Sequence, residues 1–191
     1  MRTVNKTAGT EKREKIKKEY WPAEDAWTGD NEKGWFRAPR TLPLLLSLLG
    51  EKNLSGKFDP AKVYLELLAR HMDAGIIEMA NEADHAYAAG YHGQRGVRTW
   101  QERIKALEKL GVIKTKQIGN QKFKYVLLVH PTAAIQRLRD AGKIGEVWWN
   151  TYRSRQIETK ELTYEDRLKS KKLKPAISLV PRPLRKAKKQ A

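Results

Sequence analysis

The stretch GVRTWQERIKALEKLGVIKTKQIGNQKFKYVLLV, residues 96–129, contains the pattern that decides the fold. In its first half, apolar residues recur every three or four positions, which is the period of one face of an α-helix. These residues are Val97, Trp100, Ile104, Leu107 and Leu110. The second half is divided by Gly119-Asn120, a turn pair typical of a tight hairpin. The sequence therefore predicts a long amphipathic helix that ends at Gly111, followed by two antiparallel strands.

The face of this helix opposite the apolar stripe carries long polar and cationic side chains. At about 100° per residue, these side chains lie on or at the edge of the outer face, and they concentrate toward the N-terminal end of the helix. The candidate binding residues here are Gln94, Arg95, Arg98, Thr99, Glu102, Arg103 and Lys105. Because Glu102 follows Arg98 by four positions, we expect these two to form an ion pair.

Lysines dominate the predicted hairpin. A period of two places Lys114 and Lys116 opposite Ile113. It also places two further lysines opposite a set of apolar residues expected to face the core, namely Lys122 and Lys124 opposite Phe123, Tyr125 and Leu127. We therefore expect four lysines on the solvent side of one hairpin, with Asn120 as a further candidate contact in its turn.

Four shorter elements precede the long helix. The apolar run 40–50 predicts a short buried helix that ends at Gly50, and Asp59-Pro60 is typical of the start of a core helix that continues to about residue 71. Residues 76–79 favour a short strand, and residues 81–89 a helix with Asn81 as its cap. A glycine-containing turn, residues 90–96, follows.

Two more helices are expected after the hairpin. His130-Pro131-Thr132 ends the sheet and begins a helix of about ten residues. Residues 145–152 also look helical and carry the adjacent Trp148 and Trp149. Because neighbouring helical residues point about 100° apart, burying both rings requires broad cover from the body or from a second subunit.

Charge divides the chain into parts. The sequence holds 39 Lys and Arg against 22 Asp and Glu, a formal net charge of +17, and this excess indicates a polyanionic partner. Ten bases and no acid lie in residues 167–191. This end is expected to be a flexible tail that either binds phosphates or serves only solubility. Its candidate contacts are Lys171, Lys172, Arg182 and Arg185.

Several classes of function are disfavoured by what the sequence contains. The chain has no Cys, which excludes disulfide scaffolds, thiolate zinc sites and cysteine nucleophiles. Its four His residues have no metal-ligand spacing, and no glycine motif of a nucleotide-binding loop is present. No apolar run approaches roughly 18 residues. We expect no enzyme activity, no metal, no cofactor and no membrane span, and a cytoplasmic, nucleoid-associated location.

The order helix, short strand, helix, turn, basic helix and hairpin resembles the winged helix-turn-helix DNA-binding family over residues 59–129. The helix 81–89, the glycine turn 90–96, the junction Leu110-Gly111-Val112-Ile113 and the hairpin 114–124 carry the resemblance. It implies a mainly α fold with a small antiparallel β-hairpin, extended by N- and C-terminal helices. It also implies that the long helix enters the major groove of a duplex and that the hairpin, called the wing, lies along the backbone or the adjacent minor groove.

The resemblance and the charge pattern together suggest three regions. Residues 1–33 form a charged, partly disordered arm in which the mixed-charge run 11–19 could be a solvated helix. Residues 34–160 form the body, with the core motif at 59–129 and additional helices at 132–160. Residues 161–191 form the basic tail.

The expected function is sequence-specific binding of double-stranded DNA by a homodimer that regulates transcription. One alternative is a plasmid- or phage-type replication initiation or partition factor. Another is a KH-like protein that binds single-stranded RNA, because Gly93-Gln94-Arg95-Gly96 is a GxxG loop between two helices. The helix after Pro60 is surplus to a KH domain, and Thr99 stands where an aliphatic residue is expected. A third class is an interaction protein that docks through its Trp residues.

Overall fold

The structure is a computed structural model that describes residues 8–20, 22, 36, 38–56, 58–71 and 75–173. It divides into two compact units, residues 1–35 and 36–191. In the first unit, helix α1 (Ala8–Tyr20) contains the mixed-charge run that was expected to be capable of forming a helix. All the elements discussed below belong to the second unit.

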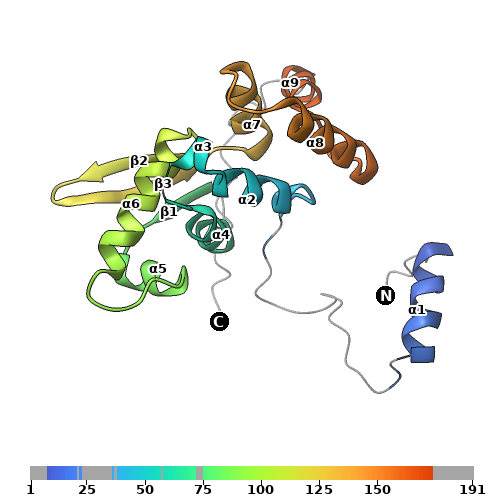
Figure 1. The fold of residues 1–191 in the computed structure, drawn as a ribbon, viewed down its shortest axis with the longest axis horizontal. Helices are drawn as coiled ribbons and strands as arrows, with labels where there is room; N and C mark the ends of the chain where they lie inside the picture. Colours follow the sequence, from blue (N-terminus) through green and yellow to red (C-terminus); the bar gives the residue numbers. More distant parts are fainter. Residues whose placement is uncertain are drawn as a thin grey trace, which may run out of the picture. The chain divides into compact units, whose positions relative to one another are not determined.

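The second unit is mainly helical in its described residues and contains a small antiparallel sheet (Figure 1). This confirms the expected α+β class. Its elements are α2 (Leu42–Gly50), α3 (Lys52–Ser55), α4 (Ala61–Arg70), β1 (Ile76–Glu78), α5 (Glu82–Ala88), α6 (Gly96–Lys109), β2 (Ile113–Ile118), β3 (Gln121–Leu128), α7 (Pro131–Asp140), α8 (Glu146–Thr159) and α9 (Tyr164–Leu173).

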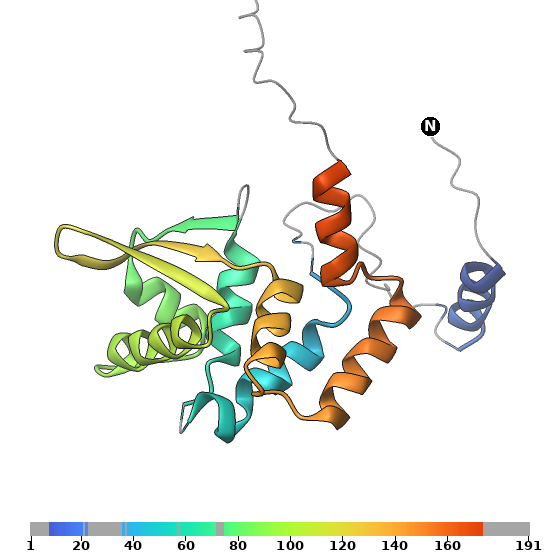
Figure 2. The same cartoon turned by 90° about the horizontal axis from the view of Figure 1, so that it is seen from above.

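The sheet has the strand order β1-β3-β2, and both pairings are antiparallel. Ile77 of β1 and Thr115 of β2 both lie opposite Val126 of the central strand. Because β1 has only three residues, the β2–β3 hairpin projects beyond it in both views (Figures 1 and 2). The sheet therefore has a three-stranded base and a two-stranded free end.

The core lies between one face of this sheet and the helices. Trp100 of α6 is fully buried, and its ring meets that of Phe123 of β3 edge to face, with the ring centroids 6.0 Å apart. Helix α4 contributes Val63, Tyr64 and Leu67, each with 0% of its surface exposed. Burying side chains of this size is the main favourable term in folding. The predicted stripe of α6 is thus confirmed as its buried face.

The turn between α5 and α6 is fixed by backbone hydrogen bonds and by two glycines. Gly90 has φ +86°, and the N–H groups of Gly90 and Tyr91 donate to the carbonyls of Tyr87 and Ala86, the pattern that ends many helices. Gly96 opens α6 against the backbone of Tyr91, where a Cβ atom would lie 2.5 Å from the Tyr91 carbonyl oxygen. The turn and the start of α6 therefore meet at a close, defined contact.

The caps expected for the shorter elements are present. Asn81 accepts a hydrogen bond from the N–H of Ala83 at the start of α5. Helix α4 begins at Ala61 rather than at Pro60, and Asp59 accepts from the N–H of Ala61 at 2.8 Å. Nδ1 of His130 accepts from the N–H of Thr132 at the start of α7. Local sequence thus determines where these helices begin.

The C-terminal helices are joined to the start of α2 by one carboxylate. Glu161, after α8, accepts from the N–H and Oγ1 of Thr41 at 2.9 and 2.8 Å. On α8, the ring of Trp148 stacks on that of Tyr152, with the centroids 5.2 Å apart. Both Trp148 and Trp149 are half-buried by the body, so the described part of the chain covers them in part without a second subunit.

The first part of the expected flexible tail is a helix, which corrects the prediction for that part. Residues 164–173 form α9, and helices α7 and α9 contact each other. The helix begins with a reciprocal cap, in which Oγ1 of Thr163 donates to Asp166 at 2.7 Å and accepts from the N–H of Asp166 at 3.1 Å. The hydrogen bond from the Thr163 hydroxyl, and after it the one that the Thr163 N–H donates to the same carboxylate oxygen at 3.2 Å, lower the pKa of Asp166. In the described part of the chain, no helix combines the length and the apolar character needed to cross a membrane.

Candidate nucleic-acid interface

Helix α6 presents a polar outer face to solvent. Gln94 and Arg95 in the turn before it are exposed, and so are Arg98 and Lys105 on the helix itself. The side chain of Arg98 has 83% of its surface exposed. The candidate residues at the N-terminal end of α6 are therefore brought together on one accessible face, with Thr99 half-buried at its edge.

Glu102 lies within reach of two arginines. Its Oε1 is 3.6 Å from Nε of Arg98, which confirms the expected ion pair, and its Oε2 is 3.5 Å from Nη1 of Arg103. An ion pair as exposed as that with Arg98 contributes at most about 1 kcal/mol to stability. Arg98 is therefore only weakly held.

Arg103 occupies a different environment from the other candidate residues. Only 17% of its side chain is exposed, and its guanidinium lies 4.8 Å from the ring centroid of Phe58 and 5.1 Å from that of Tyr91. Its Nη1 also donates to the carbonyl of Thr99 at 3.1 Å. Arg103 is at the edge of the apolar stripe, where the two rings cover it, so it does not belong to the exposed face of α6.

The expectation that the four hairpin lysines share one solvent face is wrong. The strand register places Ile76, Leu127 and Lys114 in one row across the sheet and Glu78, Tyr125 and Lys116 in the next. Tyr125 and Leu127, which were expected to face the core, are 38% and 37% exposed. Lys114 and Lys116 therefore share the outer face of the sheet, which points away from the Trp100 side of α6.

An irregularity in the hairpin explains this difference. The pairing shifts between Lys116 and Ile118, so that residues 122–124 of β3 stand opposite a single residue of β2. Phe123, within this bulge, points into the core as Val126 does, and both are at most 4% exposed. A bulge interrupts strict alternation, so a simple period of two places the side chains of Tyr125 and Leu127 on the wrong face.

The other two hairpin lysines lie on either side of Phe123. Lys122 is exposed. Nζ of Lys124 is 2.8 Å from Oε1 of Glu78, and this hydrogen bond raises the pKa of Lys124. Lys124 is therefore held by an acid of the same sheet, whereas Lys122 is accessible near the end of the hairpin.

A groove lies between the end of the hairpin and the two helices α5 and α6. Asn120 and Lys122 line it from the hairpin, Asn81 and Glu82 from the start of α5, and Gln101 from α6. Nε2 of Gln101 donates to Oε2 of Glu82 at 2.6 Å. Three of the hairpin candidates, Asn120, Lys122 and Lys124, thus line a groove next to α6. Gln101 was missed by the sequence argument because its partner Glu82 belongs to another helix.

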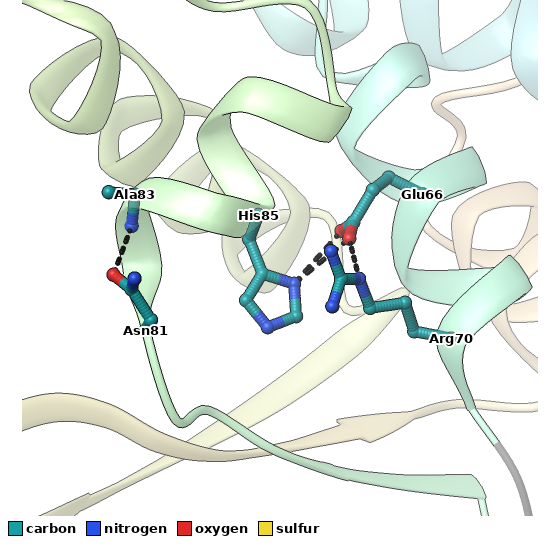
Figure 3. A network of polar contacts seen from close by, with 5 residues as sticks. All are labelled: Glu66, Arg70, Asn81, Ala83 and His85. Atoms are coloured by element: carbon teal, nitrogen blue, oxygen red, sulfur yellow. Dashed lines mark hydrogen bonds and ion pairs between the residues drawn. The ribbon is translucent and has the colours of Figure 1, made fainter.

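A polar cluster, in which Glu66 and His85 are buried and Arg70 is exposed, joins α4 and α5 (Figure 3). Nδ1 of His85 lies 3.0 and 3.2 Å from the two carboxylate oxygens of Glu66, and Nε of Arg70 donates to Glu66 Oε1 at 2.5 Å. The ring of His85 also lies 5.9 Å from that of Trp100. The cluster fixes α5 against α4 behind α6.

The four tail candidates fall partly on α9. Lys171 and Lys172 belong to α9, but their side chains lie outside the described residues, as do Arg182 and Arg185 entirely. Within the residues that the structure does describe, no group of three or more His, Asp or Glu side chains is placed to hold a metal ion.

Comparisons with protein-family models, curated proteins and solved structures find no match to this chain.

Proposed function

We propose that this chain is a winged helix-turn-helix protein that binds double-stranded DNA sequence-specifically and regulates transcription. The element order α4-β1-α5-α6-β2-β3, with the sheet order β1-β3-β2, supports this fold. In this proposal α6 is the recognition helix and the β2–β3 hairpin is the wing. Two copies bind paired half-sites as a homodimer.

The observation that carries the proposal is the exposed polar face at the N-terminal end of α6. Gln94 and Arg95 in the preceding turn and Arg98 on the helix are exposed there, and the opposite side of the helix is buried at Trp100. A helix of this kind fits the major groove, about 12 Å wide, where Arg makes paired hydrogen bonds to guanine and Gln to adenine. These three side chains are the proposed contacts to base edges.

The hairpin supplies a second, less specific set of contacts. Asn120 and Lys122 line the groove beside Gln101 of α6, which supports their assignment as contacts to the DNA backbone next to the base-contacting helix. Lys114 and Lys116, on the outer face of the sheet, contribute to affinity only through long-range attraction. Replacing Lys122 is therefore expected to weaken DNA binding more than replacing Lys114 or Lys116.

Single-stranded RNA is the second candidate ligand. Gly93-Gln94-Arg95-Gly96 lies between α5 and α6, and the order β1-α5-α6-β2-β3-α7 is also compatible with a KH domain. The place of α4 favours DNA, because Val63, Tyr64 and Leu67 are fully buried in the same core as Trp100. A KH domain has no need of such a central preceding helix.

Selection from a random duplex pool tests the proposal. The full-length protein is incubated with the pool at physiological salt, with random single-stranded RNA as competitor, and the bound fraction is sequenced. We expect an enriched duplex motif, arranged as paired half-sites. Enrichment of RNA alone would support the KH alternative, and recovery of duplexes without any common motif would contradict sequence-specific binding.

A further inference from the structure

The Glu102 carboxylate is shared by two arginines on the same helix. One oxygen faces Arg98 at 3.6 Å and the other faces Arg103 at 3.5 Å. Because different oxygens are used, both contacts exist together. The negative charge of Glu102 is thus compensated from two sides.

The two arginines differ in their freedom to move. Arg103 is held by the rings of Phe58 and Tyr91 and by its bond to the Thr99 carbonyl. Its Nε is buried and has no hydrogen-bond partner among the described residues, so its guanidinium fills a site formed mainly by stacking. Arg98, by contrast, is 83% exposed. Only Arg98 can leave Glu102 without disturbing the core.

We propose that Arg103 is a positioning residue that compensates Glu102 and so allows Arg98 to be released to DNA. This inference rests on the proposed function. When Arg98 turns toward a base or phosphate, Glu102 would otherwise be left as an uncompensated anion beside the DNA backbone. The fixed Arg103 keeps a cation at its other oxygen, and the release of Arg98 then costs little.

The inference predicts how the affinity for DNA changes when Arg103 and Glu102 are replaced singly and together. Without Arg103, Glu102 interacts with Arg98 alone and also repels the duplex, so DNA affinity falls. Replacing Glu102 by Gln in the same protein removes both effects and restores the affinity. A role limited to supporting the fold predicts no such rescue, since the Glu102→Gln change does not replace the stacking of Arg103 on Phe58 and Tyr91.

The test compares Arg103→Met, Glu102→Gln and the double variant by fluorescence anisotropy on the selected duplex at fixed salt. We expect Arg103→Met to weaken binding by up to about fivefold, the range of one exposed ion pair, and the double variant to return to within about twofold of the wild type. Arg155→Met on α8 is the matched control, because Arg155 also pairs with a carboxylate, that of Glu158, at 2.7 Å. It should leave binding within about twofold of the wild type.

Several outcomes would separate the two proposals. A wild-type protein that binds no duplex contradicts the proposed function itself. A wild type that binds, with a double variant as weak as Arg103→Met, overturns the inference alone. Should Arg103→Met not fold, Glu102→Gln decides by itself: because Arg103 already compensates Glu102, this change is expected to raise the affinity for DNA by less than about twofold, and a larger gain overturns the inference.

Discussion

Glu108, near the end of α6, holds Thr115 of strand β2 through one carboxylate oxygen. Its Oε1 accepts from the backbone N–H of Thr115 at 3.2 Å and from the Thr115 hydroxyl at 2.6 Å. Strand β2 is at the edge of the sheet, where unpaired N–H groups are open to solvent or to another strand. The contact therefore satisfies an edge group and fixes the hairpin relative to the helix.

Replacing Glu108 by Ala should lower the free energy of unfolding by about 0.5–1 kcal/mol, because two exposed hydrogen bonds to one carboxylate are lost. Urea denaturation followed by circular dichroism measures the change. Lys109→Ala, at the exposed neighbouring position, is the control and should change stability by less than about 0.5 kcal/mol. Equal effects of the two substitutions would mean that the Glu108–Thr115 contact contributes nothing.

Gly96→Ala should destabilise the protein by about 1–3 kcal/mol, the usual cost of overpacking. The added Cβ would lie 2.5 Å from the Tyr91 carbonyl oxygen, and backbone atoms there cannot move aside as a flexible side chain can. Gly50→Ala is a matched control, since its Cβ would meet Asp59 at an ordinary 3.6 Å. The control should be neutral or slightly stabilising in thermal unfolding. A neutral Gly96→Ala would refute the close contact between the turn and α6.

Glu161→Ala should cost about 1–2 kcal/mol, because the N–H of Thr41 loses a charged acceptor at the start of α2. The effect is measured by urea denaturation. Glu165→Ala, which removes an exposed acid at the start of α9, should stay within about 0.5 kcal/mol. If Glu161→Ala were as mild as the control, the joint between the C-terminal helices and α2 would be unimportant for stability.

The buried phenol of Tyr64 is expected to make the folded protein less stable at alkaline pH. Burial raises the pKa of this phenol from 10.0 to about 12. Between these values the unfolded chain releases the proton while the folded protein keeps it, so the free energy of unfolding falls as pH rises from about 10 to 12. The Tyr64 hydroxyl has no hydrogen-bond partner among the described residues. Tyr64→Phe should therefore be neutral or stabilising at pH 7 and should lose less stability above pH 10.

The difference between Tyr64→Phe and the wild type is the quantity to measure, since other groups titrate equally in both proteins. Tyr152, whose pKa is also raised to about 12, first by burial, remains in both proteins. Identical pH profiles above pH 10 would contradict the assigned burial effect.

Features carried by neighbouring residues could be predicted from the sequence. The stripe ending at Leu110 and the cap at Asn81 each depend on spacings of a few residues, and both are confirmed. The helix α9 was predictable in the same way, because Thr163 and Asp166 have the spacing of a reciprocal cap. The high positive charge of residues 167–191 led to the prediction of a flexible tail, although this cap pattern indicates a helix.

Features that depend on tertiary contacts could not be predicted. The bulge that leaves Phe123 facing inward but Tyr125 and Leu127 facing outward arises where the hairpin meets Trp100, and a strict alternation gives no sign of it. Glu66 and His85 come from different helices, and Glu161 is 120 residues from Thr41. Arg103 shows the same limit: its helical position marks it as a boundary residue, but only the fold brings Phe58 and Tyr91 around it.

The central claim, that the outer face of α6 recognises base pairs, is tested most directly by one affinity ratio. Binding of Arg95→Ala/Arg98→Ala is measured on the selected duplex and on a scrambled duplex of equal length at the same salt, with Lys114→Ala/Lys116→Ala as a control of equal charge. The account predicts that the α6 variant loses most of the preference for the selected duplex, by about 1–3 kcal/mol per lost base contact, while the control keeps it. An unchanged ratio, with equal losses on both duplexes, would contradict the claim and leave these arginines as phosphate contacts only.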